Sequence, residues 1–353
     1  MKFFFLFVLF FVSIPAQSAK FKVVFINPGN PDQNTTGDFW SNVTLFMSAA
    51  ASDLDIELVT YYAYRDHIFM KSIAEQVLIE KPEFVILVNE KDQALPLIKR
   101  LTSANVKIFS LLNRISKSDY AQLSKQQQSN IKGSVVPDNF GVGKKLLNGL
   151  LSTYNQASNI TKPINLLALQ GDYSTPASIA REQGLLSALS ANNNINLIDS
   201  TVANWSSEQA YNKVKGIIKR TPIDIIWAAN DPMAFGAKKA ISELALSYPV
   251  VIGGINWDVE NPKYPIALSF GGHVTLGAQA IIMLEGIHTN NLPVEQTNQK
   301  LDIFESSISS HHAKFSELLA TKSIDEYDFS QFSYSTDKPL IFTIGNLLST
   351  YGL

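Results

Sequence analysis

Short apolar runs alternate along this chain with segments that repeat apolar residues at helical spacing. Four such runs are Lys22–Asn27, Ile56–Tyr62, Phe84–Asn89 and Val106–Leu112. The segments between them, Phe39–Ser52, Ile68–Glu80 and Gln93–Ser103, have the periodicity of helices. The runs are apolar throughout, as in parallel strands whose two faces are both covered by helices. The pattern predicts an α/β unit in the order βαβαβαβ.

The same alternation returns in the second half of the chain. Predicted strands are Ile164–Gln170, Asn196–Thr201, Ile223–Ala228 and Pro249–Ile255, and predicted helices are Gly141–Tyr154, Pro176–Ser190, Ser207–Arg220 and Pro232–Ala245. A chain of 353 residues is long enough for two domains. We therefore expect two doubly wound lobes, each with a parallel sheet.

Two stretches break this alternation. Ile115–Lys132 is polar and rich in Gln and Ser, and we interpret it as a loop and linker between the units. From about Asn290 the pattern is less regular, with a polar helix candidate at Ser306–Ala320 and an apolar segment at Leu340–Leu348. This tail has no obvious place in either predicted unit.

The N-terminus has the order of a secretory signal peptide. Lys2 precedes the 12-residue apolar run Phe3–Ile14, and small residues follow in Pro15–Ala19. Cleavage after Ser18 or Ala19 would release the mature chain, whereas an uncleaved anchor is the alternative. The chain contains no cysteine, so it has no lipid-modified Cys and no disulfide. We expect a soluble protein outside the cytoplasm.

Composition and motifs argue against several function classes. The formal net charge is -2, which gives no broad electrostatic attraction to nucleic acid or an anionic membrane. We find no Gly-x-Ser-x-Gly elbow, no Walker loop and no Gly-x-Gly-x-x-Gly after the first strand. His311 and His312 are adjacent and so face different sides of a helix, which disfavours a metal site. We expect a protein that is not an enzyme and that needs no cofactor or metal.

Polar residues follow four of the predicted strands directly. They are Asn89, Asn113-Arg114, Asn230-Asp231 and Asn256-Trp257. Ligands of open α/β sheets bind outside the carboxyl ends of the strands. Asn and Asp at such positions also make turns and helix caps, which is the alternative for each one. Their recurrence in both units favours a shared ligand cleft.

Five motifs carry a resemblance to a known family. In chain order they are Val135-Val136-Pro137-Asp138-Asn139 with Gly143, Ala180-Arg181-Glu182-Gln183-Gly184, the run from Ala228 to Ala237, Gly253-Gly254-Ile255-Asn256, and Leu276-Gly277-Ala278. Their order and spacing, from about Phe21 to His288, resemble the type I periplasmic binding proteins of the ribose-binding-like group. Each motif is weak alone, whereas five in order are specific.

The resemblance implies two Rossmann-like lobes joined by a three-segment hinge, with the ligand between them. Residues 1–19 would be the signal peptide, 20–136 and 271–300 the N-terminal lobe, and 137–270 and 301–353 the C-terminal lobe plus a tail. It also implies a periplasmic monomer whose partners are a carbohydrate-like small molecule and an inner-membrane ABC permease.

The resemblance further implies a set of ligand-binding residues. These are the aromatic pair Phe39-Trp40 against a sugar ring, Asn113 and Asn256 at positions that are usually Asp, Arg181, and Asn230. The apolar C–H faces of a sugar suit an aromatic platform. The alternatives are core packing for the aromatic residues and a solvated helix position for Arg181. Five further candidates are Asn89, Asp138, Trp205, Trp257 and His273.

The departures from the family pattern also carry information. Both usual acids are amides here, and the position of the family Gln falls at Gly271, with His273 two residues further on. Asn both donates and accepts hydrogen bonds, where Asp only accepts. The pocket is therefore less anionic, and a simple aldose is not assured.

The favoured function is a solute-binding protein that captures a sugar or sugar-like ligand for an ABC importer. The alternative is a sensory binding protein that presents its ligand to a membrane receptor, such as a histidine kinase or a cyclic-dinucleotide enzyme. Gly253–Trp257 and Ser269–His273 resemble a sensory subgroup that includes relatives of the periplasmic autoinducer-binding proteins. A cytoplasmic transcription regulator and a secreted enzyme are disfavoured by the signal peptide and by the missing catalytic motifs.

Overall fold

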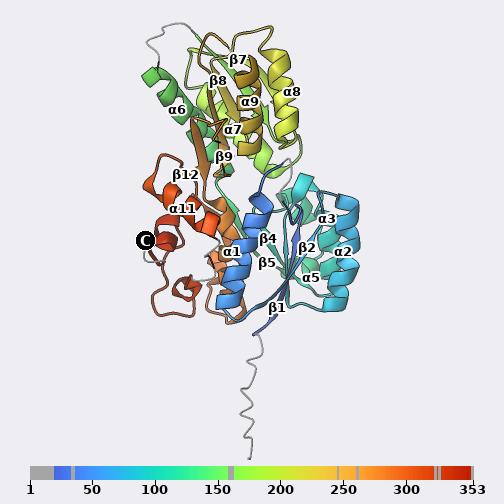
Figure 1. The fold of residues 1–353 in the computed structure, drawn as a ribbon. Helices are drawn as coiled ribbons and strands as arrows, with labels where there is room; N and C mark the ends of the chain where they lie inside the picture. Colours follow the sequence, from blue (N-terminus) through green and yellow to red (C-terminus); the bar gives the residue numbers. More distant parts are fainter. Residues whose placement is uncertain are drawn as a thin grey trace, which may run out of the picture.

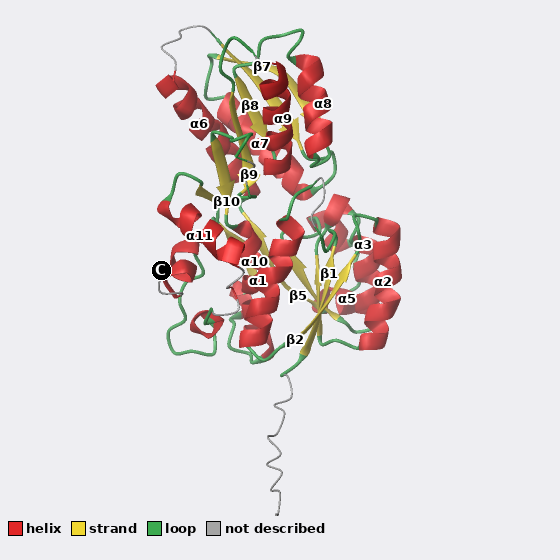
Figure 2. Ribbon diagram, in the orientation of Figure 1, coloured by secondary structure: helices red, strands yellow, loops and turns green. Residues whose placement is uncertain are grey.

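The computed structural model describes residues 20–32, 36–157, 163–244, 246–259, 262–321, 324 and 327–350. These residues form two six-stranded sheets, in the orders β11-β5-β4-β3-β1-β2 and β12-β10-β9-β8-β6-β7. Each sheet has helices on both faces and forms its own lobe (Figures 1 and 2). The predicted fold class is confirmed. The predicted signal peptide, residues 1–19, lies outside the described residues.

The first lobe shows why most of the residues in its central strands are apolar. Its strands are β1 Lys22–Asn27, β2 Glu57–Tyr62, β3 Phe84–Leu87, β4 Lys107–Leu111, β5 Ile131–Pro137 and β11 Asn298–Leu301, and each pairs with its neighbours in parallel. Val23 and Phe25 pack with the helices α1 Phe39–Asp53 and α10 Leu276–His288. Val24 and Ile26 point to the opposite face, toward α2 His67–Glu80 and α3 Leu95–Ser103. Successive residues are thus both buried, which removes the polar alternation of a half-exposed strand.

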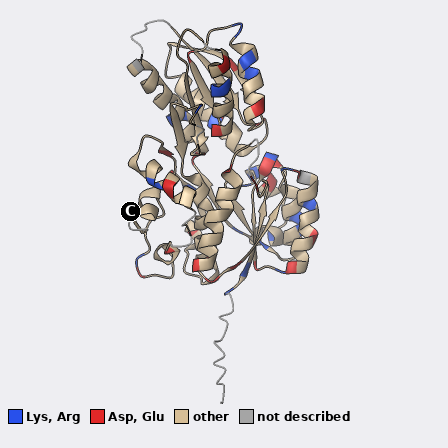
Figure 3. Cartoon of the chain, in the orientation of Figure 1, with Lys and Arg blue, Asp and Glu red and all other residues tan. Residues whose placement is uncertain are grey.

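The second lobe repeats this arrangement. Its parallel strands are β6 Ile164–Gln170, β7 Ile195–Val202, β8 Ile225–Ala228, β9 Val251–Asn256 and β10 Leu268–Gly271, and β12 Glu305–Ser306 adds antiparallel to β10. Its helices are α6 Asn139–Ala157, α7 Pro176–Leu189, α8 Ser207–Ile217 and α9 Asp231–Leu244. Charged side chains are scattered over the helices of both lobes (Figure 3). Among the described residues, no helix combines the length and apolar character needed to cross a bilayer.

In the described ranges the chain passes between the sheets three times. The passages are β5 to α6, β10 to α10 through the short helix η2 His273–Thr275, and β11 to β12. Asp138 ties the first passage to the third, because its carboxylate lies 2.7 Å from Lys300 Nζ and its backbone N–H donates to Leu301. The first and third hinge segments are therefore joined to each other at the junction of the lobes.

The prediction of a loop and linker at Ile115–Lys132 is wrong. The segment contains two short helices, α4 Lys117–Ala121 and α5 Lys125–Ser129, and its last residues begin β5. Ser116 caps α4, and Ser124 forms a capping box with Gln127 at the start of α5. Side-chain caps, rather than apolar periodicity, hold these polar helices in place, which is why the periodicity did not indicate them.

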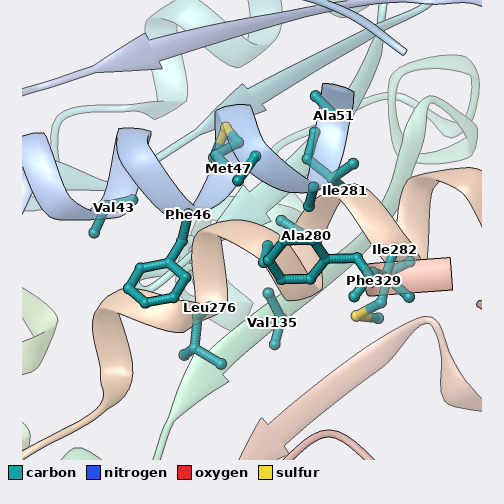
Figure 4. Packing of buried hydrophobic residues seen from close by; sticks show 14 of the residues in the cluster. Val43, Phe46, Met47, Ala51, Val135, Leu276, Ala280, Ile281, Ile282 and Phe329 are labelled. Atoms are coloured by element: carbon teal, nitrogen blue, oxygen red, sulfur yellow. The ribbon is translucent and has the colours of Figure 1, made fainter. Parts of the chain in front are cut away.

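The C-terminal tail packs on the first lobe. Its helices are α11 Ser310–Thr321, η5 Phe329–Phe332 and α12 Ile344–Thr350. Phe315 stacks on Phe46 of α1 at 5.6 Å, and Phe329 lies beside Ile282 of α10 (Figure 4). We expected residues 301–353 to belong with the second lobe. Strand β12 does pair there, but the apolar side chains of the later helices cover the α1 and α10 face instead.

Candidate functional site

A cavity lies between the two lobes, with an empty volume of about 560 Å³ that includes some space open to solvent. It is lined by Thr36, Phe39, Trp40, Arg65, Glu90, Leu112, Asn113, Pro137, Asn139, Thr175, Ala177, Arg181, Trp205, Asn230, Asn256 and His273. Each of these residues lies at or after the carboxyl end of a parallel strand. The cavity thus occupies the position where open α/β sheets bind ligands, and its size suits a small molecule.

Aromatic rings enter the cavity from both lobes. Phe39 and Trp40 begin α1, and their ring centroids are 5.0 Å apart at an interplanar angle of 78°. Trp205 follows β7, and its indole N–H donates to Asp172 at 2.7 Å. The first lobe therefore offers two aromatic faces and the second offers one, each able to cover apolar C–H surface of a ligand.

Glycines leave the room that two of these rings occupy. A Cβ built on Gly29 would lie 2.3 Å from Trp40 Cγ, and one built on Gly171 would lie 2.1 Å from Trp205 Cζ2. Such distances are far inside van der Waals contact. Any side chain at these two positions would displace the ring that lines the cavity.

Arg181 is the buried cation of the cavity. It lies on α7 and is 4% exposed. Its Nε donates to Asn139 Oδ1 at 3.0 Å, and its Nη1 donates to the carbonyl of Ala229 at 2.5 Å. Burial lowers the pKa of its guanidinium from 12.5 to about 9. The group therefore keeps its charge at neutral pH.

His273 meets Arg181 from the hinge passage that leads into α10. Its Nε2 lies 3.2 Å from Arg181 Nη2, and its ring packs between Phe39 at 4.8 Å and Phe304 at 4.5 Å. A guanidinium only donates hydrogen bonds, so Nε2 must accept and the ring proton is on Nδ1. Burial, and then the charge of Arg181, hold the pKa of His273 well below its usual value. The imidazole is neutral at neutral pH.

Four amides line the cavity, and one of them, Asn139, already accepts from Arg181. The side chain of Asn113 has no hydrogen-bond partner among the described residues. Asn256 donates to Asp258 at 3.0 Å, and Asn230 accepts from the backbone of Met233 and donates to the carbonyl of Trp205. Asn230 thus caps α9. Asn113 is the amide best placed to serve a ligand.

Comparison with known proteins agrees with this geometry. The family model described as a periplasmic binding protein domain matches residues 25–264. This chain belongs to the periplasmic binding protein family. Within the described ranges of this periplasmic binding protein, no group of three or more His, Asp or Glu side chains is arranged to hold a metal ion.

Two curated relatives match part of this periplasmic binding protein. The xylitol-binding protein of Mycolicibacterium smegmatis is 24% identical over 210 residues, which cover 59% of this chain and 55% of that protein. The D-allose-binding periplasmic protein of Escherichia coli is 26% identical over 145 residues, covering 41% of this chain and 45% of that protein. The matched regions thus span about half the length of these relatives.

Solved structures match over more of the chain. A periplasmic sugar-binding protein from Pseudomonas fluorescens has a TM-score of 0.79 and 27% identity, covering 93% of this chain and 99% of that one. A solute-binding protein from Actinobacillus succinogenes with bound D-allose has a TM-score of 0.68 and 21% identity, covering 83% of this chain and 99% of that one. The second likeness supports the fold alone.

Of the eleven side chains predicted to bind ligand, eight line the cavity. They are Phe39, Trp40, Asn113, Arg181, Trp205, Asn230, Asn256 and His273. Asn89, Asp138 and Trp257 lie outside the lining. Asn89 accepts from Ala94 and donates to Asp92, and Asp138 pairs with Lys300 in the hinge. The ring of Trp257 packs against the tail, 5.3 Å from Phe315.

The sequence interpretation missed several lining residues of this binding protein. Arg65 Nη2 lies 2.8 Å from Glu90 Oε1, and burial raises the pKa of Glu90. Glu90 follows Asn89 at a strand end, so its position was available as a signal. Asn139 lies in a quoted motif, yet its contact with Arg181 depends on the fold. Arg65 had no sequence signal, since it lies in a turn after β2 with a positive φ of 58°.

Proposed function

We propose that this protein is a periplasmic solute-binding protein that holds a sugar or sugar-like ligand between its lobes for an inner-membrane ABC importer. The observation that carries the proposal is the cavity itself, in which aromatic faces and polar side chains from both lobes converge. A sugar needs this combination, because its ring has apolar faces and a rim of hydroxyl groups. The names of the relatives, which state binding of xylitol and of D-allose, support the same ligand class.

Each lobe would contribute distinct contacts. In this proposal Trp40 and Phe39 stack on the ligand from the first lobe, and Trp205 covers it from the second. Asn113 and Arg181 would bond to its polar groups, because both retain hydrogen-bonding capacity toward the cavity. The protein would act by binding rather than by catalysis, in line with relatives that are named as binding proteins.

The proposed route to the periplasm is a cleaved signal peptide. The mature chain would begin at Ala19 or Lys20 and work as a monomer with a permease. Sequencing of the N-terminus of protein purified from its native host tests the cleavage, and recovery of Met1 would contradict it. We propose import over receptor signalling, and stimulation of a permease ATPase by the loaded protein tests that choice.

The ligand class is tested by a thermal-shift screen of monosaccharides, polyols and nucleosides, followed by calorimetric titration of the hits. A ligand at 100 times its dissociation constant adds about 2.7 kcal/mol of stability, which is a readily measured shift. We expect at least one sugar or polyol to bind with a 1:1 stoichiometry. Binding of nucleosides alone, or turnover of a glycoside panel, would overturn the proposal.

A further inference from the structure

The charges around the cavity do not balance. Three lining side chains, Arg65, Glu90 and Arg181, are of ionisable types that carry full charge at neutral pH in water. Arg65 and Glu90 pair with each other at 2.8 Å. Arg181 has no carboxylate partner among the described residues, since it bonds to an amide oxygen, a backbone carbonyl and a neutral imidazole. The cavity therefore contains one buried positive charge without a counterion at contact distance.

Arg181 also retains unused donors. A guanidinium has five N–H groups, and three of them are directed to Asn139, Ala229 and His273. The remaining two are on the terminal nitrogens, one on each. Carboxylates accept hydrogen bonds from both terminal nitrogens of an arginine, and such charge-assisted pairs are among the strongest in proteins. Arg181 thus has two free N–H groups, which can only donate hydrogen bonds, on a positively charged side chain.

The acidic residues near Arg181 do not neutralise its charge. Asp231 acts on Arg181 electrostatically, but its carboxylate accepts from Ser269 Oγ at 2.8 Å and from the backbone of Asp258 at 3.0 Å, and it does not line the cavity. Asp258 is buried beside Asp231, and burial raises its pKa well above the usual value. Asn113 and Asn256, which also line the cavity, carry amides and so add no negative charge.

Resting on the proposed sugar-binding function, we propose that the ligand is a sugar acid, a uronate or an aldonate, whose carboxylate binds Arg181. A charge buried without a partner is unfavourable, and an anionic ligand offsets that cost where a neutral sugar leaves it in place. The empty volume of about 560 Å³, part of which is open to solvent, lies in the size range of small-molecule sites. Asn113, with its free amide, bonds to hydroxyl groups of the same ligand.

Calorimetric titration with matched sugars tests the inference. The probes are D-galacturonate with D-galactose, D-glucuronate with D-glucose, D-gluconate, and D-glucose 6-phosphate, all at pH 7.5 and 0.15 M salt. We expect one acid to bind at least tenfold more tightly than the neutral sugars. Neutral sugars that bind as well as the acids, or a phosphate that binds better, would overturn this inference and leave the proposed function standing. No binding by any sugar in this panel and in the wider screen would overturn both.

A pair of variants that each introduce one negative charge separates an electrostatic effect on binding from an effect on folding. Asn113→Asp places a carboxylate in the cavity at a side chain that has no partner to lose, and we expect it to lower the affinity for the acid more than tenfold. Asn193→Asp makes the same charge change on the exposed turn before β7, at the opposite end of that sheet, and serves as the control. The inference would be overturned if Asn113→Asp and Asn193→Asp bound the acid with equal affinity. Arg181→Gln should abolish the preference for acids over neutral sugars.

Discussion

Arg181 Nη2 and His273 Nε2 lie 3.2 Å apart, and this contact joins α7 of the second lobe to the hinge passage that leads into α10. Because the guanidinium can only donate, the contact requires a neutral imidazole with its proton on Nδ1. The orientation of the buried cation therefore depends on the protonation state of a residue on the hinge.

Replacing Arg181 should weaken ligand binding. Arg181→Ala removes charge-assisted hydrogen bonds worth about 1.5–3 kcal/mol each, so we expect a ten- to hundredfold or larger loss of affinity. The variant also leaves Asn139 and the Ala229 carbonyl without their donor, which should lower the free energy of unfolding by about 1–3 kcal/mol. Calorimetry on the folded variant and urea unfolding measure the two effects. Wild-type affinity would show that Arg181 has only a structural role.

Replacing Trp40 should also weaken ligand binding. Trp40→Ala removes stacking area and should cost affinity comparably to Arg181→Ala, whereas Trp40→Phe keeps an aromatic face and should be milder. The melting temperature of Trp40→Ala should fall as well, since the ring packs against the hydrophobic core between the first sheet and the helices α1 and α10. A lower melting temperature with unchanged affinity would place Trp40 in the core alone.

Gly171→Ala should act through Trp205. The new Cβ would lie 2.1 Å from the indole ring, so the ring must move and its bond to Asp172 must lengthen or break. We expect at least a severalfold loss of affinity, measured by titration. Gly216→Ala is the matched control, because nothing lies within 4 Å of a Cβ there and alanine suits the interior of α8. An equal response of the two variants would refute the role of the glycine.

The contribution of His273 should be a loss of stability when the pH falls below about 6.5. The pKa of His273 is lower in the folded than in the unfolded state, so below that pH the unfolded chain binds a proton that the folded chain excludes. The loss is at most about 1.4 kcal/mol per pH unit and ends at the folded pKa. His273→Gln keeps an acceptor for Arg181 and should reduce the slope between pH 7.5 and 5.5 in urea unfolding. Burial lowers the pKa of His312, which acts in the same direction, and raises the pKa values of Glu90 and Asp258, which act in the opposite direction in both proteins.

Removing one aromatic side chain of the tail should destabilise the first lobe. Phe315 is fully buried and stacks on Phe46, so Phe315→Ala should cost about 3–5 kcal/mol of unfolding free energy. Phe315→Leu fills most of the volume and should cost less. Chemical unfolding of both variants is the measurement. A wild-type midpoint for Phe315→Ala would mean that the tail contributes nothing to the lobe.

The strands and helices whose apolar residues recur at regular spacing were predictable from the sequence. The buried strands and amphipathic helices of both lobes follow from apolar runs and helical spacing, and strand ends such as Asn113 and Asn256 indicated where the cavity lies. The short helices α4 and α5 were not predictable in this way, since their stability comes from side-chain caps. The spacing of apolar residues does not distinguish a capped polar helix from a polar loop.

Contacts between residues far apart in the sequence were also not predicted. Trp257 follows a strand in the same way as Asn113 follows one, yet the tail covers it, and nothing near it in the sequence reports that contact. Arg65 reaches the cavity through a turn with positive φ, which its residue type does not favour. The aromatic residues of the tail were visible in the sequence, but the lobe that they join depends on the path of the whole chain.

The position of the tail sets an order for folding. The strands β6 to β10 of the second lobe lie within residues 164–271, so that lobe can assemble most of its core from one continuous stretch. The first lobe begins earlier but needs α10, β11 and the helices of residues 310–350 to cover the α1 face. Until those later segments are in place, the apolar side of α1 lies uncovered, which makes the partly folded first lobe prone to aggregation.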